Sequence, residues 1–167
     1  MKTIYSCGEC AACCKTHGVE SIQKNPQSSC TFCVANQGCT IYADRPDECR
    51  SFKCSWLDGK GGGLEYRPDR TGVVPVHEFI PDIGESILIL TEFNQGSLNS
   101  EFIFKWTQAN LFRGYFTIHR PIHGNDRIYL PKGAENPTEE EHRFFEHYFQ
   151  KKIDFIPFES FLSTLVL

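Results

Sequence analysis

All nine cysteines of this 167-residue chain lie between Cys7 and Cys54. They begin with two short-spaced groups, CxxCxxCC at residues 7–14 and CxxC at residues 30–33, and single cysteines follow at longer spacing. Two cysteines separated by two residues can turn their sulfur atoms toward one ion, and short-spaced cysteine groups are typical of metal sites. The N-terminal third of the chain is therefore predicted to be a metal–thiolate unit.

The N-terminus and the hydropathy of the chain indicate a compartment. No apolar signal-peptide core precedes Cys7, and no stretch approaches the roughly 18 apolar residues that a membrane span needs. We therefore expect a cytoplasmic protein without a membrane partner, in a compartment that keeps thiols reduced. A disulfide would contribute only about 2–4 kcal/mol, whereas structural zinc contributes about 10–16 kcal/mol. Metal binding is thus favoured over disulfides and over a thiol-redox role.

The charge of the chain argues against a nucleic-acid partner. The formal net charge is −4, and the lysine and arginine residues form no concentrated basic patch. Nucleic-acid binding normally needs such a patch to displace counterions. A Cys2His2 zinc finger is excluded as well, because His17 has no histidine partner about three to five residues away. We expect metal ions and no nucleic acid as partners, and the sequence identifies no protein partner.

The expected fold class is α+β with two unlike parts. Few large apolar residues lie between Lys15 and Cys54, so this segment cannot build a core of its own. We expect an irregular cysteine-rich metal-binding module at 1–58, a Gly-rich linker and connector at 59–72, and a small mixed half at 73–167 packed on the module. That half should contain short antiparallel strands and about three helices.

Local patterns place the elements of the C-terminal half. β-branched and leucine-rich runs bounded by turn residues predict strands at residues 73–79, 86–91, 115–119 and 127–130. Apolar residues at helical spacing predict helices at residues 97–113, 138–152 and 157–167. The second of these helices opens with Thr138-x-x-Glu141, a capping box. The third has an apolar face that we expect to dock on the protein's own core.

Two motifs in the N-terminal third resemble a known family. CxxCxxCC at residues 7–14, together with GCTIYADRPDECRSFKCSW at residues 38–56, is similar to the bacterial cysteine-cluster proteins described as zinc- or iron-chelating domains. The resemblance covers residues 7–57, Arg-Pro-Asp at residues 67–69 extends it weakly, and it implies metal chelation but no reaction. Cys33 is an additional thiol and a further candidate ligand. The eight cysteines of the family pattern fall here on Cys7, Cys10, Cys13, Cys14, Cys30, Cys39, Cys49 and Cys54.

The cysteine spacing also bears on the number of metal centres. The side chains of Cys13 and Cys14 point apart, so the adjacent pair cannot easily bind one ion in an unstrained tetrahedron. Two centres, or one polynuclear cluster, are expected, and four-sulfur sites suit zinc as well as iron–sulfur chemistry. Arg45 and Arg50 flank Cys49 and are placed to stabilise thiolates from a second shell. A surface salt bridge or a hydrogen bond to a backbone carbonyl is the alternative role for both.

These patterns leave three functional hypotheses. The first is a metal-binding protein with a structural or a sequestration and delivery role. The second is an iron–sulfur redox or radical enzyme whose C-terminal half positions a substrate, and the third is a zinc-stabilised adaptor that recruits a protein through residues 157–167. We identify no catalytic motif, because Gly-x-Ser-x-Gly is absent and Glu139-x-x-His142 lacks the second such motif of a di-iron site.

Overall fold

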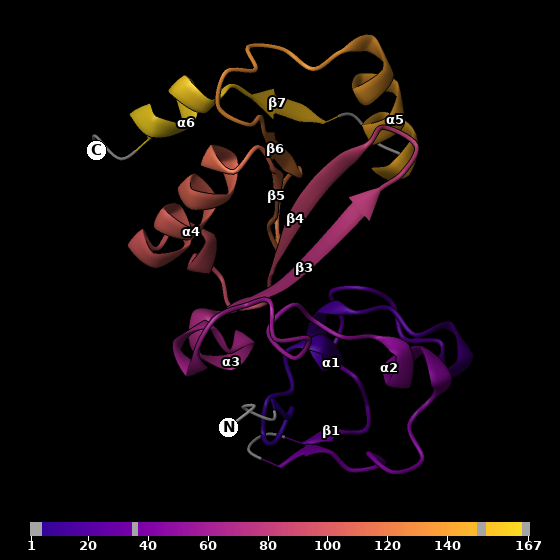
Figure 1. The fold of residues 1–167 in the computed structure, drawn as a ribbon. Helices are drawn as coiled ribbons and strands as arrows, with labels where there is room; N and C mark the ends of the chain where they lie inside the picture. The colour runs from indigo at the N-terminus through magenta and orange to yellow at the C-terminus, as the bar shows by residue number, and fades with distance from the viewer. Residues whose placement is uncertain (1–4, 35–36, 150–152, 165–167) are drawn as a thin grey trace.

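The computed structural model describes residues 5–34, 37–149 and 153–164. It has the predicted α+β architecture, with a region of short, irregular elements below a sheet that carries helices (Figure 1). The cysteines lie in the lower region, and residues 73–156 build the sheet. Within the described ranges, every helix is too short or too polar to span a bilayer.

The sheet has five strands in the order β3-β4-β5-β6-β7. Their bounds are Val73–Ile80 for β3, Glu85–Glu92 for β4, Phe116–Arg120 for β5, Arg127–Tyr129 for β6 and Asp154–Ile156 for β7. β3 pairs with β4, and β5 with β6, in the predicted antiparallel direction. The β4–β5 and β6–β7 pairs are parallel. The sequence patterns predicted neither these parallel pairs nor β7.

Two helices supply the connections that the parallel strands need. Parallel neighbours cannot be joined by a tight turn and take a longer crossover, which is usually helical. α4, Glu101–Phe112, connects β4 to β5, and α5, Glu139–Phe149, connects β6 to β7. The mixed sheet therefore follows from where the helices fall between the strands along the chain.

The helix starts follow local capping rules. The residues 97–99, predicted as the first turn of a longer helix, form the 3-10 helix η3, Ser97–Asn99. α4 then begins after Ser100, whose Oγ accepts a hydrogen bond from the Ile103 backbone N–H at 3.3 Å. α5 opens with the predicted capping box, in which the backbone N–H of Thr138 donates to Glu141 Oε2 at 2.6 Å and the backbone N–H of Glu141 donates to Thr138 Oγ1 at 3.2 Å.

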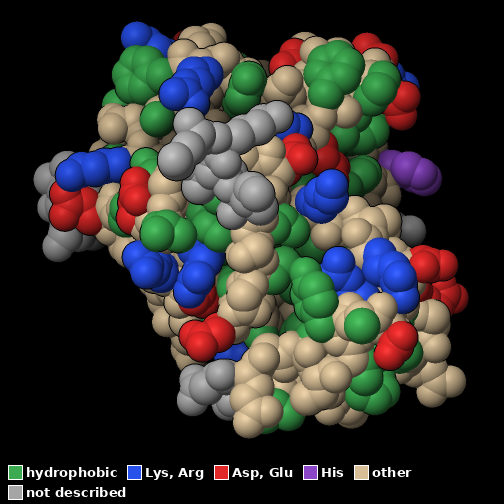
Figure 2. Space-filling view, turned by 60° about the horizontal axis from the view of Figure 1, so that its bottom comes forward, with side chains coloured by type: hydrophobic (Ala, Val, Ile, Leu, Met, Phe, Trp, Pro, Cys, Tyr) green, Lys and Arg blue, Asp and Glu red, His purple; other side chains and the backbone are tan. Residues whose placement is uncertain are grey.

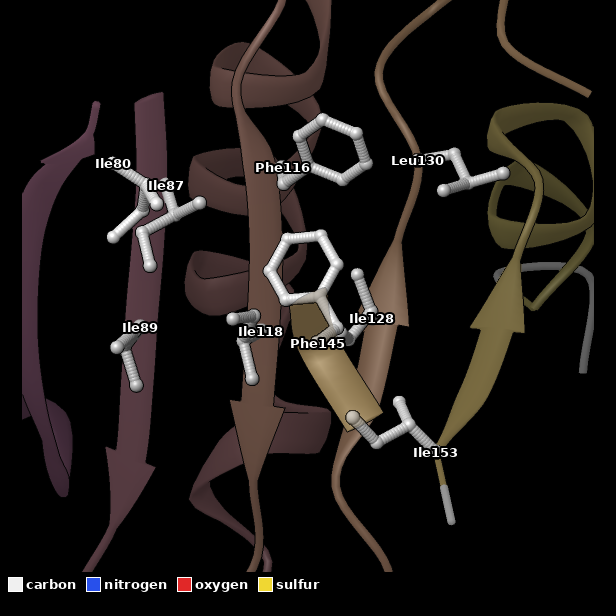
Figure 3. Packing of buried hydrophobic residues seen from close by; sticks show 9 residues of the cluster. All are labelled: Ile80, Ile87, Ile89, Phe116, Ile118, Ile128, Leu130, Phe145 and Ile153. Carbon is white, nitrogen blue, oxygen red and sulfur yellow. The ribbon is translucent and has the colours of Figure 1, made fainter. Parts of the chain in front are cut away.

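The sheet is buried on both faces, and β4 shows why. It carries four apolar residues in a row, at 87–90, and successive strand side chains point to opposite faces. Its isoleucines face α5 and join a cluster of nine buried residues around Phe145 (Figure 3). Its leucines face α4 and pack with Ile103. The hydrophobic core is thus divided between two layers, one on each side of the sheet.

The C-terminal helix docks on the protein's own core, as predicted. α6, Phe158–Ser163, buries Phe158 and Phe161, and the Phe161 ring stacks on Phe104 of α4 with centroids 4.4 Å apart. The last three residues of the helix predicted at 157–167 lie outside the described residues. So do the last three of the helix predicted at 138–152.

The cysteine region is irregular, as predicted, and contributes to none of the three clusters of buried apolar side chains in the described structure. Its helices and strands have between two and five residues each. They are α1 Cys13–Thr16, η1 Glu20–Ile22, β1 Cys33–Val34, β2 Gly38–Cys39 and α2 Asp47–Ser51. A region of this kind has little burial to stabilise it and depends on cross-links or on its neighbour.

Ser55 joins the cysteine region to the sheet. Its backbone N–H donates to the Pro75 carbonyl at 2.8 Å, and its Oγ accepts from the His77 backbone N–H at 2.7 Å. The same Oγ lies 2.8 Å from Nδ1 of the His77 ring, whose Nε2 lies 3.4 Å from Asn110 Oδ1 in α4. Residue 55 is thereby fixed against β3, and its neighbour Cys54 is fixed with it.

The segment 59–72, predicted as a linker and connector, contains η2, Leu64–Tyr66, and α3, Pro68–Thr71. The Tyr66 ring packs against two rings of α4, with centroids 4.7 Å and 5.0 Å away. Gly61 lies directly against Trp56, because a Cβ at Gly61 would come within 2.7 Å of the Trp56 Cα. Packing against the neighbouring aromatic residues therefore holds this glycine-rich segment.

A buried histidine predicts a pH dependence of the sheet's stability. His119 in β5 is 3% exposed, and its Nε2 lies 2.8 Å from Thr107 Oγ1. Burial, with a smaller contribution from the positive charge of Arg127, lowers the pKa of His119 from 6.5 to about 3. The unfolded chain therefore binds a proton that the folded chain does not, so His119 contributes its stability above pH 6.5 and loses it as the pH falls toward 3.

Between pH 7 and pH 5 we expect His119 to reduce the free energy of unfolding by about 2 kcal/mol. Chemical unfolding at both pH values measures the change, and His119→Gln, which keeps a hydrogen-bonding side chain for Thr107 but does not titrate, provides the control. An equal loss of stability in the wild type and in His119→Gln would assign the pH dependence to other groups.

Candidate metal centre

The cysteine region contains two neighbouring cavities that share part of their lining, with volumes of about 110 Å³ and 40 Å³. The first is lined by Cys7, Cys10, Cys13, Cys14, Cys39, Cys49 and Cys54. The second is lined by Cys13, Cys14, Cys30, Cys39 and Cys49. Together these are the eight cysteines of the family pattern, and Cys33 lines neither cavity. Figure 2 shows the face at the bottom of Figure 1, where the cysteine region lies. Hydrophobic side chains, a class that includes cysteine, lie there between lysine and arginine side chains.

Short-range backbone contacts bring cysteines from separate segments together. The backbone N–H of Cys30 donates to the Cys14 carbonyl at 2.9 Å, which joins the second CxxC group to α1. Cys33 and Cys39 are partners in the antiparallel β1–β2 pair. Cys49 lies in α2, which begins directly after Pro46. Sulfur atoms that are far apart in sequence thus line the same cavities.

We define the first thiol group as Cys7, Cys10 and Cys54. Burial is the largest influence on Cys10 and raises its pKa, while the backbone N–H groups of Ala12 and Asp69 donate to its sulfur and lower the pKa in part. Asp69 belongs to the Arg-Pro-Asp segment, where Arg67 Nε lies 2.6 Å from Asp69 Oδ1. The ion pair fixes the residue whose amide reaches the thiol.

Cys54 has the same kind of environment. Burial raises its pKa most, the backbone N–H groups of Leu57 and Trp56 donate to its sulfur and lower the pKa, and the charges of Cys10 and Cys7 raise it. Amide donors aimed at sulfur stabilise a thiolate over a thiol. Two sulfur atoms of the first group are therefore already provided with the hydrogen bonds that a metal-bound thiolate accepts.

We define the second thiol group as Cys13, Cys14, Cys30, Cys33, Cys39 and Cys49. Cys14 is at its centre, and its hydrogen bond with Cys13, followed by burial, raises its pKa far above the ordinary value. Burial and then the charge of Cys14 raise the pKa of Cys33 to about 11. Burial also raises the pKa of Cys49, to which Cys14, Cys30 and Cys39 add through space. Because burial and neighbouring sulfur atoms disfavour the thiolate form, Cys14, Cys33 and Cys49 keep their protons unless a cation compensates the charge.

The chemistry of this donor set fits a thiophilic cation. Clustered thiolates select zinc, copper(I) or iron–sulfur chemistry, and coordination to a metal deprotonates a thiol outright. All nine cysteines are free thiols. Among the described residues, no three Cys, His, Asp or Glu side chains stand in an arrangement that could hold an ion. Completing a four-sulfur site therefore requires cysteine side chains to turn to other staggered rotamers.

Arg45 and Arg50 both line the first cavity, and their guanidinium groups have other partners. Arg50 donates from Nε to the Arg45 carbonyl at 2.8 Å and from a terminal nitrogen to the Ala43 carbonyl at 3.0 Å. The Arg45 guanidinium lies over the Tyr42 ring, 4.0 Å from its centroid. Arg50 Nε also lies 3.9 Å from Asp47 Oδ1, so Arg50 makes both contacts of its alternative role, a salt bridge and hydrogen bonds to backbone carbonyls.

Lys24 is the residue at this site that the sequence analysis missed. Its side chain is 9% exposed and lines the second cavity beside five cysteines. No spacing rule marks a single lysine before a polar turn. Its position follows from the fold of the segment between the CxxCxxCC and CxxC groups, which no local pattern specifies.

Comparison of the chain with models of known protein families, with curated proteins and with solved structures finds no match. The resemblance to the cysteine-cluster family therefore rests on the motifs at residues 7–14 and 38–56 alone.

Proposed function

We propose that this chain is a metal-binding protein that chelates zinc or iron through the cysteine thiolates of its N-terminal region. One observation carries the proposal: eight cysteines from separate segments of the chain line two adjoining cavities. Burial and the mutual repulsion of thiolate charges both oppose ionisation of thiols gathered in this way. A thiophilic cation removes both costs.

Two centres account best for the donor set. The first thiol group supplies Cys7, Cys10 and Cys54, and the second group is crowded around Cys14 and Cys30. Four thiolates complete one tetrahedral site, so eight suffice for two. The cysteines that line both cavities would be shared out between the centres or would bridge them.

The energetic need for metal lies in the same region. Residues 5–54 contribute to no cluster of buried apolar side chains in the described structure. Structural zinc contributes about 10–16 kcal/mol, which is comparable with the whole stability of a domain. We infer a structural or a sequestration and delivery role in a reducing, cytoplasmic environment. An iron–sulfur enzyme would use the same thiols, and its colour would reveal it.

Metal analysis of the full chain purified without oxygen tests the proposal. We expect about two ions of zinc or iron per chain. Colourless protein with zinc supports the chelating role, whereas visible absorbance with iron supports the iron–sulfur alternative. A folded, metal-free chain in which all nine thiols react with a thiol reagent, and which takes up neither added zinc nor iron, would refute metal binding.

A further inference from the structure

The backbone of Lys24 is held in one position by a closed turn. Lys24 and Val19 form an antiparallel bridge, in which the Lys24 N–H donates to the Val19 carbonyl at 2.9 Å and the Val19 N–H donates to the Lys24 carbonyl at 2.8 Å. Gln23, directly before Lys24, has a φ of 52°, in the left-handed region that closes the turn. The direction of the Lys24 side chain is therefore set by the loop.

Lys24 is a buried residue, and the hydrogen bonds of its ammonium group go to neutral carbonyls. Its Nζ donates to the carbonyl oxygen of His17 and, at 3.2 Å, to that of Asn25. Over the described ranges, Lys24 takes part in no ion pair with an Asp or Glu side chain. Withdrawing an ammonium from water is unfavourable unless an opposite charge compensates it. Neutral carbonyls satisfy hydrogen bonds but carry no net charge.

The opposite charge available to Lys24 is sulfur. It lines the second cavity together with Cys13, Cys14, Cys30 and Cys49, and burial lowers its pKa while these four cysteines raise it. An ammonium has three N–H donors, and two of them reach carbonyl oxygens, which leaves one for a sulfur acceptor. The lysine is thus placed as both a positive charge and a hydrogen-bond donor for the second thiol group.

We propose that Lys24 is the charge-compensating positioning residue of the second thiol group, where its ammonium balances negative charge that the thiolates leave around a bound cation. The inference rests on the proposed function. Four thiolates around one divalent ion carry a net charge of −2, and a fixed positive group at close range stabilises them. Arg50 does not line the second cavity, and the guanidinium of Arg45, which does line it, lies over the Tyr42 ring.

The consequence is a selective effect on metal retention. Lys24→Gln keeps hydrogen-bond donors for the carbonyls but removes the charge, so we expect one of two zinc ions to be lost to a chelator about 10–100-fold more readily. Lys24→Arg keeps the charge and should retain zinc much better than Lys24→Gln. Lys15→Gln is the matched control, because Lys15 is exposed, lies over the Phe93 ring at 5.3 Å and lines neither cavity.

The experiment loads the full chain and the three variants with zinc and titrates each with a chromophoric zinc chelator. Native mass spectrometry counts the ions that remain, and far-ultraviolet circular dichroism checks the fold. Should Lys24→Gln fail to fold, Lys24→Met takes its place as the neutral variant. An equal loss of zinc from Lys24→Arg and from the neutral variant would overturn the role of charge. Zinc retention in Lys24→Gln equal to the wild type overturns the role of Lys24 and leaves metal binding intact. A wild type that binds no zinc or iron overturns the proposed function instead.

Discussion

Cys10→Ser and Cys49→Ser should each lower the metal content of the chain and unfold the cysteine region. Cys10 belongs to the first thiol group and Cys49 to the second, so each substitution removes a ligand from a different group. A serine hydroxyl is not an effective ligand for a thiophilic cation. Bound zinc contributes about 10–16 kcal/mol, and the described residues of this region form no apolar cluster of their own. The loss of zinc therefore exceeds what the remaining contacts can supply.

Metal analysis and amide hydrogen exchange measure the two effects separately. We expect amides in residues 5–34 and 37–54 to lose protection while amides of the sheet at 85–92 stay protected, since the sheet has its own core. Wild-type metal content and protection in both variants would remove Cys10 and Cys49 from the set of ligands.

Cys33→Ser is the matched control for these two variants. The Cys33 thiol forms a hydrogen bond with Cys14 but lines neither cavity, so its replacement by a hydroxyl should change metal content little. A loss of metal in Cys33→Ser as large as in Cys49→Ser would instead place Cys33 among the ligands. The control therefore decides whether Cys33, the one cysteine outside the eight of the family pattern, is a ligand.

Local signals were enough to predict the β3–β4 hairpin and the helices α4, α5 and α6. β3 and β4 are runs of apolar and β-branched residues around a turn. β3 is one residue longer than predicted at its C-terminal end, and β4 is one residue longer at each end. The capping box at Thr138 and Glu141 fixes the start of α5 through hydrogen bonds between residues three apart. Such features depend on neighbours in sequence, so the sequence reveals them.

The strand order could not be predicted in the same way. β4 and β5 are separated by α4, and whether they pair parallel depends on how α4 packs back on the sheet through Ile103. β7 has three residues and gains its place only by pairing with β6. Both features are set by contacts between distant segments, which no local pattern encodes.

The sequence identified the thiols that line the candidate site, but not how they are grouped. The cysteine spacing predicts metal binding, because short-spaced thiols suit few other purposes in the reducing compartment that we expect. The association of Cys54 with Cys7 and Cys10 depends on Ser55, which β3 holds at Pro75 and His77. Lys24 reaches the second thiol group through the turn from Val19, and a single lysine carries no motif.

Phe145→Ala should lower the free energy of unfolding of the sheet and its helices more than any other single substitution. Phe145 on α5 is fully buried, and its ring lies 5.4 Å from Phe116 and 6.0 Å from Phe155 between centroids. Figure 3 shows it among the isoleucines of the central strands. Removing such a ring loses its transfer free energy and leaves a cavity, which costs about 3–5 kcal/mol. Denaturant unfolding of the metal-loaded chain gives the value.

Phe79→Ala is the control, because Phe79 lies on β3 of the same sheet and is 62% exposed. It should change the free energy of unfolding by less than about 0.5 kcal/mol. Similar losses in the two variants would mean that Phe145 does not pack in the core as the structure has it.

Phe145→Ala also tests how the cysteine region and the sheet depend on each other. The cysteine region is attached to the sheet through Ser55, which bonds Pro75 and His77 of β3. We expect chelation to unfold the cysteine region and leave the sheet, whereas Phe145→Ala should lower the denaturant midpoint of both regions together. A cysteine region that keeps its midpoint in Phe145→Ala would show that its metal suffices without the sheet. We expect the cysteine region to depend on the sheet and not the reverse, because all three apolar clusters found among residues 5–34, 37–149 and 153–164 lie in the sheet and its helices.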